Sequence, residues 1–107
     1  QNYVDARARI YEDYGPSEQM IENRDYAFLI LNPEHAAYAT CMAVDKRSGE
    51  AAVLDQVLKE LAGRLRLGFR DSAESTGQFE LYIMDETGEL APYAAYDLKE
   101  YVFTAYR

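Results

Sequence analysis

Apolar residues near the start of the chain recur with the period of an α-helix. In "NYVDARARIYEDYGP", residues 2–16, polar side chains fall largely outside the apolar face, which holds Tyr3, Val4, Ile10, Tyr11 and Tyr14. Gly15 can adopt a left-handed conformation, and Pro16 cannot continue a helical hydrogen-bond ladder. The pattern predicts a helix that ends at Gly15, and Ser17 is a possible cap for a further short turn over residues 18–21.

Two segments that follow have the composition of strands. "DYAFLIL", residues 25–31, is a short continuous apolar run between polar residues, which is typical of a buried strand. "AAYATCMAV", residues 36–44, permits a helix capped by Asn32 ahead of Pro33, or a strand. We favour the strand because the segment runs directly into "DKRSGE", whose composition is that of a hairpin turn.

The clearest helical pattern lies in "AAVLDQVLKELAGRL", residues 51–65. Pairs of opposite charge stand four positions apart, Asp55 with Lys59 and Glu60 with Arg64. The apolar residues recur at helical spacing on the other side: Val53, Leu54, Val57, Leu58, Leu61 and Leu65. The pattern predicts an amphipathic helix that covers a sheet or another subunit.

A second hairpin is predicted in the last third of the chain. "FELYIM", residues 79–84, alternates and is rich in strand formers, and "ELAPYAAY" resumes after Gly88. Pro92 lacks a donor for the ladder, so the second strand should lie at a sheet edge or be short.

The end of the chain carries helix-start signals. Asp97 with Glu100 three positions later matches a capping box, and Tyr96 with Tyr101 a hydrophobic staple. These signals predict a terminal helix over residues 97–107, although "EYVFTAY" alone has the composition of a strand.

The stretches "VDKRSGE" and "MDETGEL" lie about forty residues apart and have the same plan. Neither offers oxygen ligands at the spacing of a calcium loop, whereas an Asp followed by Gly49 or Gly88 suits a tight turn that needs a positive φ. We therefore interpret both stretches as turns. "LKE" also recurs, at residues 58–60 and 98–100, so a duplicated unit and a chance similarity both remain open.

The predicted order is helix, two strands, helix, two strands, helix. A chain of 107 residues is long enough for one hydrophobic core and too short for two, so we predict a single domain, residues 1–107. The economical arrangement is an α+β fold of two layers, in which helices cover an antiparallel four-stranded sheet.

Charge and composition exclude several classes of protein. The formal charge of −8 is spread over both halves of the chain, which argues against nucleic-acid binding because that requires clustered Lys and Arg. No apolar run approaches the length of a membrane span, and we expect no membrane association. A single cysteine, Cys41, and no visible signal segment weakly favour the cytoplasm.

The sequence shows no pattern typical of catalysis or metal binding. His35 and Cys41 would lie about 20 Å apart along a strand, too far for a dyad. No phosphate-binding loop, nucleophile elbow or zinc spacing is present. We therefore expect no cofactor, no metal and no catalytic residues; a hydrolase would need a cleft holding a carboxylate with a shifted pKa.

The unusual feature of the composition is ten tyrosines without a tryptophan. Tyrosine is enriched at protein interfaces, and four tyrosines lie near acidic residues in the last seventeen positions. We predict a non-catalytic protein-binding module, such as an acidic adaptor, a small chaperone or an inhibitor or immunity-type protein, that binds a partner with a basic surface. Whether it is a homodimer stays open. The predicted binding residues are Tyr93, Tyr96, Asp97, Glu100 and Tyr101. The alternative is a small-molecule sensor with a pocket lined by Tyr and Phe.

Overall fold

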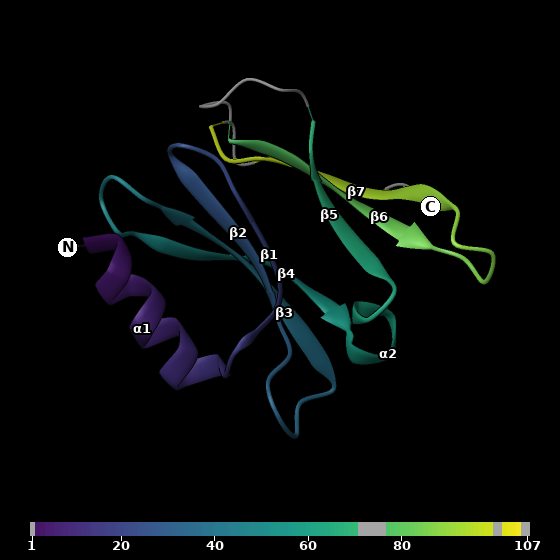
Figure 1. Ribbon diagram of the computed structural model, residues 1–107, viewed down its shortest axis with the longest axis horizontal. Helices are drawn as coiled ribbons and strands as arrows, with labels where there is room; N and C mark the ends of the chain where they lie inside the picture. Colours follow the sequence, from purple (N-terminus) through teal and green to yellow (C-terminus); the bar gives the residue numbers. More distant parts are fainter. Residues whose placement is uncertain (1, 71–76, 100–101, 106–107) are drawn as a thin grey trace.

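The computed structural model describes residues 2–70, 77–99 and 102–105 (Figure 1). The elements in chain order are α1 (Asn2–Tyr14), β1 (Ser17–Glu22), β2 (Tyr26–Leu31), β3 (Tyr38–Asp45), β4 (Ala51–Leu58), α2 (Lys59–Ala62), β5 (Leu65–Phe69), β6 (Gln78–Met84), β7 (Leu90–Asp97) and β8 (Val102–Ala105). Most of the described chain is therefore β-strand.

The strands form two antiparallel sheets. Sheet 1 has the order β1-β2-β3-β4 and sheet 2 the order β5-β6-β7-β8. Within each sheet, every strand pairs with the strands that precede and follow it in the sequence. Figure 1 shows α1 on one side of sheet 1 and the strands of sheet 2 on the other. The molecule consequently has three layers, with sheet 1 in the middle.

The main core fills the space between the two sheets. Phe28 of β2 stacks on Phe79 of β6 with ring centroids 3.9 Å apart, and Phe79 stacks on Tyr96 of β7 at 4.8 Å. Stacked rings of this kind bury a large apolar area. The aromatic stack therefore ties β2 of sheet 1 to β6 and β7 of sheet 2.

A second, smaller core lies between α1 and the outer face of sheet 1. Ala6 and Ile10 of α1 are buried against Ala27, Leu29, Leu31, Met42 and Val44. Every residue of β2 is buried, because one face of the strand meets sheet 2 and the other meets α1. This double covering explains why β2 is a continuous apolar run.

Polar contacts fix the start of α1 to the sheet. The Tyr3 hydroxyl donates to Glu22 Oε2 at 2.8 Å, and Lys46 Nζ lies 3.3 Å from the same oxygen. The hydrogen bond from Tyr3, with Lys46, holds the pKa of Glu22 below its usual value. Burial, together with the bond to Glu22, raises the pKa of Tyr3 to about 12. The two pKa shifts favour the ionised Glu22 carboxylate and the protonated Tyr3 hydroxyl, which are the forms that make this hydrogen bond.

Several elements predicted from the sequence are confirmed. They are the helix that ends before Gly15, the strand after Asp25, the strand interpretation of residues 36–44, and the hairpin on either side of Gly88. Each of these depends on local signals, namely a stop, an apolar run or a turn.

The predicted fold class is wrong. Two sheets pack face to face, instead of one four-stranded sheet covered by helices, and α2 has four residues. Residues 51–65 form β4, α2 and the start of β5 rather than one helix, because pairing with β3 outweighs the helical spacing. Residues 17–22 are also a strand, and residues 102–105 form β8 where a terminal helix was predicted.

Both Asp–Gly stretches are turns, as predicted. Asp45 Oδ1 accepts the Arg47 backbone N–H at 2.8 Å, and Asp85 Oδ1 accepts the Thr87 N–H at 2.9 Å. Gly49 and Gly88 have φ values of 79° and 89°, in the left-handed region.

The likeness between the two hairpins extends beyond their turns. The pairing of β3 with β4 shifts register between residues 41 and 42, and that of β6 with β7 between residues 81 and 82. The extra residue falls on the second strand of each hairpin, at Leu54 and at Tyr93. Each sheet thus contains a hairpin with a bulge in its second strand, although Asp45 pairs with Glu50 across one turn and Asp85 with Glu89 across a turn one residue shorter.

Candidate functional site

The predicted tyrosine surface is only partly at the surface. Tyr96 is 2% exposed and belongs to the aromatic stack, whereas Tyr93 is half-buried against the main core. Asp97 is half-buried at the end of β7 and accepts a hydrogen bond from Gln78 Nε2 at 2.8 Å. Glu100 and Tyr101 lie outside the described residues. Binding at Tyr93 and Asp97 stays a prediction, and Tyr96 is positioned for packing.

Asp55 of β4, with Tyr96 and Cys41 nearby, forms a polar cluster between the sheets. The Tyr96 hydroxyl donates to Asp55 Oδ2 at 3.1 Å. Burial, and after it the nearby Asp55 carboxylate, raises the pKa of the Cys41 thiol to about 12. Burial also raises the pKa of Tyr96. Thiol and phenol are both held in their protonated forms, so neither side chain is a ready nucleophile at neutral pH.

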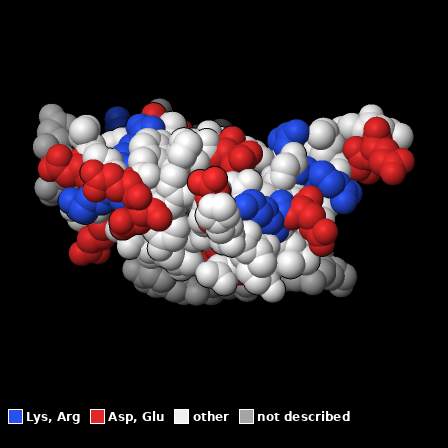
Figure 2. Space-filling model, turned by 90° about the horizontal axis from the view of Figure 1, so that it is seen from below, with Lys and Arg blue, Asp and Glu red and all other residues white. Residues whose placement is uncertain are grey.

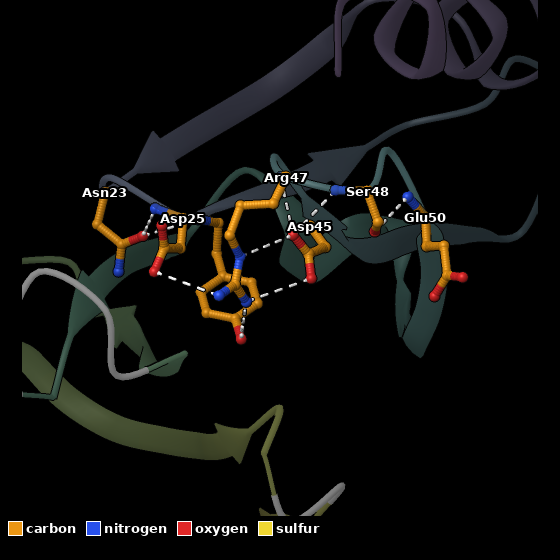
Figure 3. A network of polar contacts seen from close by, with 7 residues as sticks. Asn23, Asp25, Asp45, Arg47, Ser48 and Glu50 are labelled. Atoms are coloured by element: carbon orange, nitrogen blue, oxygen red, sulfur yellow. Dashed lines mark hydrogen bonds and ion pairs between the residues drawn. The ribbon is translucent and has the colours of Figure 1, made fainter. Parts of the chain in front are cut away.

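Arg47, in the turn between β3 and β4, is the centre of a polar network (Figure 3). Its Nε lies 3.4 Å from Asp45 Oδ1 and its Nη1 lies 3.9 Å from Asp25 Oδ2. Its Nη2 donates to the Tyr26 hydroxyl at 3.4 Å, and the guanidinium carbon lies 5.8 Å from the centre of that ring. The network joins the β3–β4 turn to the β1–β2 turn.

The contacts of this network hold two turns together. Burial alone would raise the pKa of Asp45, but hydrogen bonds from the backbone and side chain of Arg47 lower it overall. Asn23 Oδ1 accepts the backbone N–H groups of Asp25 and Tyr26 at 3.1 and 2.8 Å, which closes the neighbouring turn. The carboxylates of this network are paired with Arg47 and Asn23 Oδ1 is paired with two backbone N–H groups, whereas the buried Asn23 Nδ2 has no partner among the described residues.

A groove of about 710 Å³ runs between α1 and the β3–β4 hairpin. Its lining includes the apolar residues Ala6, Ile10, Met42, Ala51 and Val53, and the charged residues Arg9, Asp13 and Glu50. Asp5 and Arg9 line a smaller hollow beside Ser48 and Gly49, two residues that also line the groove. We call this feature the α1–β4 groove. It combines an apolar surface with a charged one in which acids outnumber the single arginine.

The groove ends at a strand without a neighbour on its outer side. Among the described residues, β4 pairs with β3 and lies at the edge of sheet 1. At the opposite edge, β1 meets β5, and the Gln19 side-chain amide donates to the Leu65 carbonyl. An unpaired strand edge presents backbone donors and acceptors to any strand that approaches.

The hairpin hydrogen bonds identify which residues of β4 face outward. The Asp45 N–H donates to the Glu50 carbonyl, and the Lys59 N–H donates to the Ala37 carbonyl. Hydrogen-bonding direction alternates along an antiparallel strand, and Leu54 is the extra residue of the bulge. The residues whose backbone groups point away from β3 are therefore Ala51, Val53, Gln56 and Leu58; we call them the open edge.

The side chains of the open edge are exposed. Val53 is 50% exposed and Leu58 is 42% exposed, and Tyr38, opposite Leu58 on β3, is 45% exposed. Asp55 is the one charged residue of β4, and its carboxylate is bonded to Tyr96 between the sheets. Edge strands are usually protected from pairing with other chains by charged side chains, proline or a bulge. Of these three features, β4 has only the bulge, because the charge of Asp55 points between the sheets.

Acidic side chains lie at both ends of the face shown in Figure 2 and also along its middle. One end carries α1, and the other carries the β6–β7 turn, where Asp85, Glu86 and Glu89 are exposed. On this face, lysine and arginine side chains are interspersed with acids and form no continuous patch.

Comparison of the chain with family models, with curated proteins and with solved structures found no significant match. The helices within residues 2–70 and 77–99 are all too short or too polar to cross a membrane. Within the described part of the chain, no group of three or more His, Cys, Asp or Glu side chains is arranged to hold a metal ion.

Sequence analysis missed the groove and the open edge. Val53 and Leu58 were assigned to the buried face of a helix, so their exposure was not foreseen. One signal was available: a hairpin turn ends at Glu50, and the β-branched Val53 and Val57 that follow favour a strand.

Proposed function

We propose that this chain is a non-catalytic protein-binding module whose working surface is the α1–β4 groove. The observation that carries the proposal is an open apolar groove with acidic residues in its lining, next to an unpaired strand edge. Exposed apolar surface bordered by charged residues is typical of protein-interaction sites. A partner side chain that enters the groove would cover the exposed Val53 and contact the nearly buried Ile10 and Met42 at its base.

The partner is a protein segment with basic residues. The chain has a net charge of −8, and the lining of the groove and its smaller neighbour holds three carboxylates, Asp5, Asp13 and Glu50, against the single guanidinium of Arg9. Complementary charge of this kind speeds association and selects against acidic competitors. The proposal includes a cytoplasmic location, which the single cysteine favours.

The small-molecule alternative gains less support from the structure. A sensor pocket lined by Tyr and Phe was predicted, but Phe28, Phe79 and Tyr96 stack on one another inside the main core. Tyr14 is the aromatic residue in the lining of the α1–β4 groove. Phe28, Phe79 and Tyr96 therefore act in packing between the sheets.

The proposal is tested by affinity capture with two charge-reversal variants of α1. Asp13 lines the groove, while the adjacent Glu12, which is also exposed, does not. A basic partner captured by the wild-type chain should bind Asp13→Arg about tenfold more weakly, and Glu12→Arg with less than about a threefold loss. Its affinity for the wild-type chain should also fall as salt rises.

Two results would refute the proposed function. One is a captured partner that binds the two variants with equal affinity. The other is a partner whose affinity does not respond to ionic strength.

A further inference from the structure

The bulge gives the open edge an unusual spacing. Ala51 and Val53 are two residues apart, Val53 and Gln56 are three apart, and Gln56 and Leu58 are again two apart, because Leu54 is the extra residue. Backbone groups on a regular strand point to one side at every second residue. A regular strand laid along β4 would therefore pair with one half of the open edge and lose register at the other.

The spacing of two, three and two is the same in both directions along the strand. When a second copy of β4 runs antiparallel, Ala51 faces Leu58 of the second copy and Val53 faces its Gln56. The long step of one strand then lies opposite the long step of the other. From this self-complementary spacing, we propose that two copies of this chain pair through the open edges of their β4 strands to form a symmetric dimer.

The charges at the ends of β4 fit the same register. Counting one residue outward from the Ala51–Leu58 pair places Glu50 opposite Lys59 of the second copy, and two-fold symmetry repeats this pair at the other end. Lys59 Nζ donates to the Pro33 carbonyl at 3.0 Å, and its remaining protons are available to a carboxylate. Opposite charges in facing positions stabilise a strand pair, and like charges destabilise it.

The pairing also covers exposed apolar side chains. Val53 and Leu58 lie on the face of sheet 1 that carries α1, and an antiparallel strand pair keeps equivalent faces on the same side. The two sheets would merge into one continuous sheet of eight strands. Both α1–β4 grooves would open on the same face, and the dimer would therefore present two binding sites side by side.

The dimer goes beyond the partner proposed for the groove, and the two surfaces share Glu50, Ala51 and Val53. Arg9 and Asp13 belong to α1 and lie outside the β4 pairing. Loss of the dimer and loss of partner binding can therefore be measured independently, the first by mass and the second by capture with the Asp13→Arg variant.

Sedimentation velocity of charge-swapped variants tests the dimer. At about 100 µM, which exceeds a micromolar dissociation constant, the wild-type chain should sediment as a dimer, about twice 12.2 kDa. Glu50→Lys alone and Lys59→Glu alone each place like charges opposite one another twice, and we expect each to weaken the dimer about tenfold or more.

Mixing the two variants is the matched control, because it supplies an opposite charge at both ends of the strand pair. The equimolar mixture should recover the wild-type mass, and circular dichroism should show that each variant keeps the wild-type fold. A wild-type chain that stays monomeric would overturn the inference. Single variants as dimeric as the wild type, or a mixture that stays monomeric, would overturn it as well.

Discussion

The Tyr96 hydroxyl of β7 lies 3.1 Å from Asp55 Oδ2 of β4 and donates a hydrogen bond to it across the two sheets. Tyr96 is almost fully buried, so this bond gives a buried hydroxyl its acceptor. Tyr96→Phe removes the donor from a half-buried carboxylate. We expect the free energy of unfolding to fall by about 1–3 kcal/mol, measured by urea denaturation followed by circular dichroism.

Tyr38→Phe is the matched control, because the Tyr38 side chain is half exposed on β3. Its loss of a hydroxyl should change the free energy of unfolding by less than about 0.5 kcal/mol. Equal effects of the two substitutions would show that the Tyr96–Asp55 bond does not join the sheets.

The buried Cys41 thiol should be unreactive in the folded protein. Burial raises its pKa to about 12, so almost no thiolate exists at pH 8. Ellman's reagent should label Cys41 in the denatured chain within minutes, and in the native chain only at the rate of unfolding. Fast stoichiometric labelling under native conditions would contradict the burial of the Cys41 side chain between the sheets.

The Tyr3–Glu22 contact predicts how stability depends on pH. The folded-state pKa of Glu22 is lowered, so its contribution is complete above the unfolded pKa of about 4.3 and is lost as the pH falls. The folded-state pKa of Tyr3 is raised to about 12, so its contribution is complete below its ordinary pKa and is lost as the pH rises toward 12.

Tyr3→Phe removes the Tyr3 contribution and the share of the Glu22 contribution that comes from the Tyr3 hydroxyl, while Lys46 remains beside Glu22. We expect it to lower the free energy of unfolding at pH 7 by about 0.5–1 kcal/mol and to flatten both ends of the pH profile. Denaturation of the wild-type and variant chains between pH 3 and pH 11 makes the comparison. A variant whose profile runs parallel to that of the wild type would be inconsistent with the contact between α1 and β1.

The β6–β7 turn requires glycine for its backbone conformation. Gly88 has a φ of 89°, and no atom lies within 4 Å of the position of an added Cβ. Gly88→Ala should therefore cost about 1–2 kcal/mol through backbone strain alone. Gly63 has a φ of −68° and no atom within 4 Å of an added Cβ, so Gly63→Ala should be neutral or slightly stabilising. Thermal unfolding of the two variants beside the wild-type chain measures both effects.

Local chemistry accounts for the parts of the fold that the sequence could predict. The β3–β4 turn depends on Asp45 and Gly49, and each forms its contacts within the turn itself. Asp97 was predicted to begin a helix by capping it. Its carboxylate does accept the Lys99 backbone N–H at 2.9 Å, but the turn leads into β8. The turn was visible in the sequence, and the strand composition of "EYVFTAY" was outweighed by the helix-start signals before it.

Long-range pairing accounts for the failures. The apolar residues of positions 51–58 have helical spacing, yet the segment forms a ladder of backbone hydrogen bonds with β3. In that arrangement Val57 is buried and Val53 is exposed. The α1–β4 groove depends on how Arg9 and Asp13 of α1 sit relative to a strand about forty residues later. No periodicity within either segment contains that information.

Hydrogen exchange along β4, measured residue by residue at two protein concentrations, tests the central claim most directly. The amides of Ala52 and Val57 face β3 and should be protected at every concentration. The amides of Ala51, Val53, Gln56 and Leu58 should exchange quickly in dilute solution and become protected as the concentration rises. Uniform protection along β4 in dilute solution, or fast exchange of those four amides at every concentration, would contradict an open edge that pairs with a second copy.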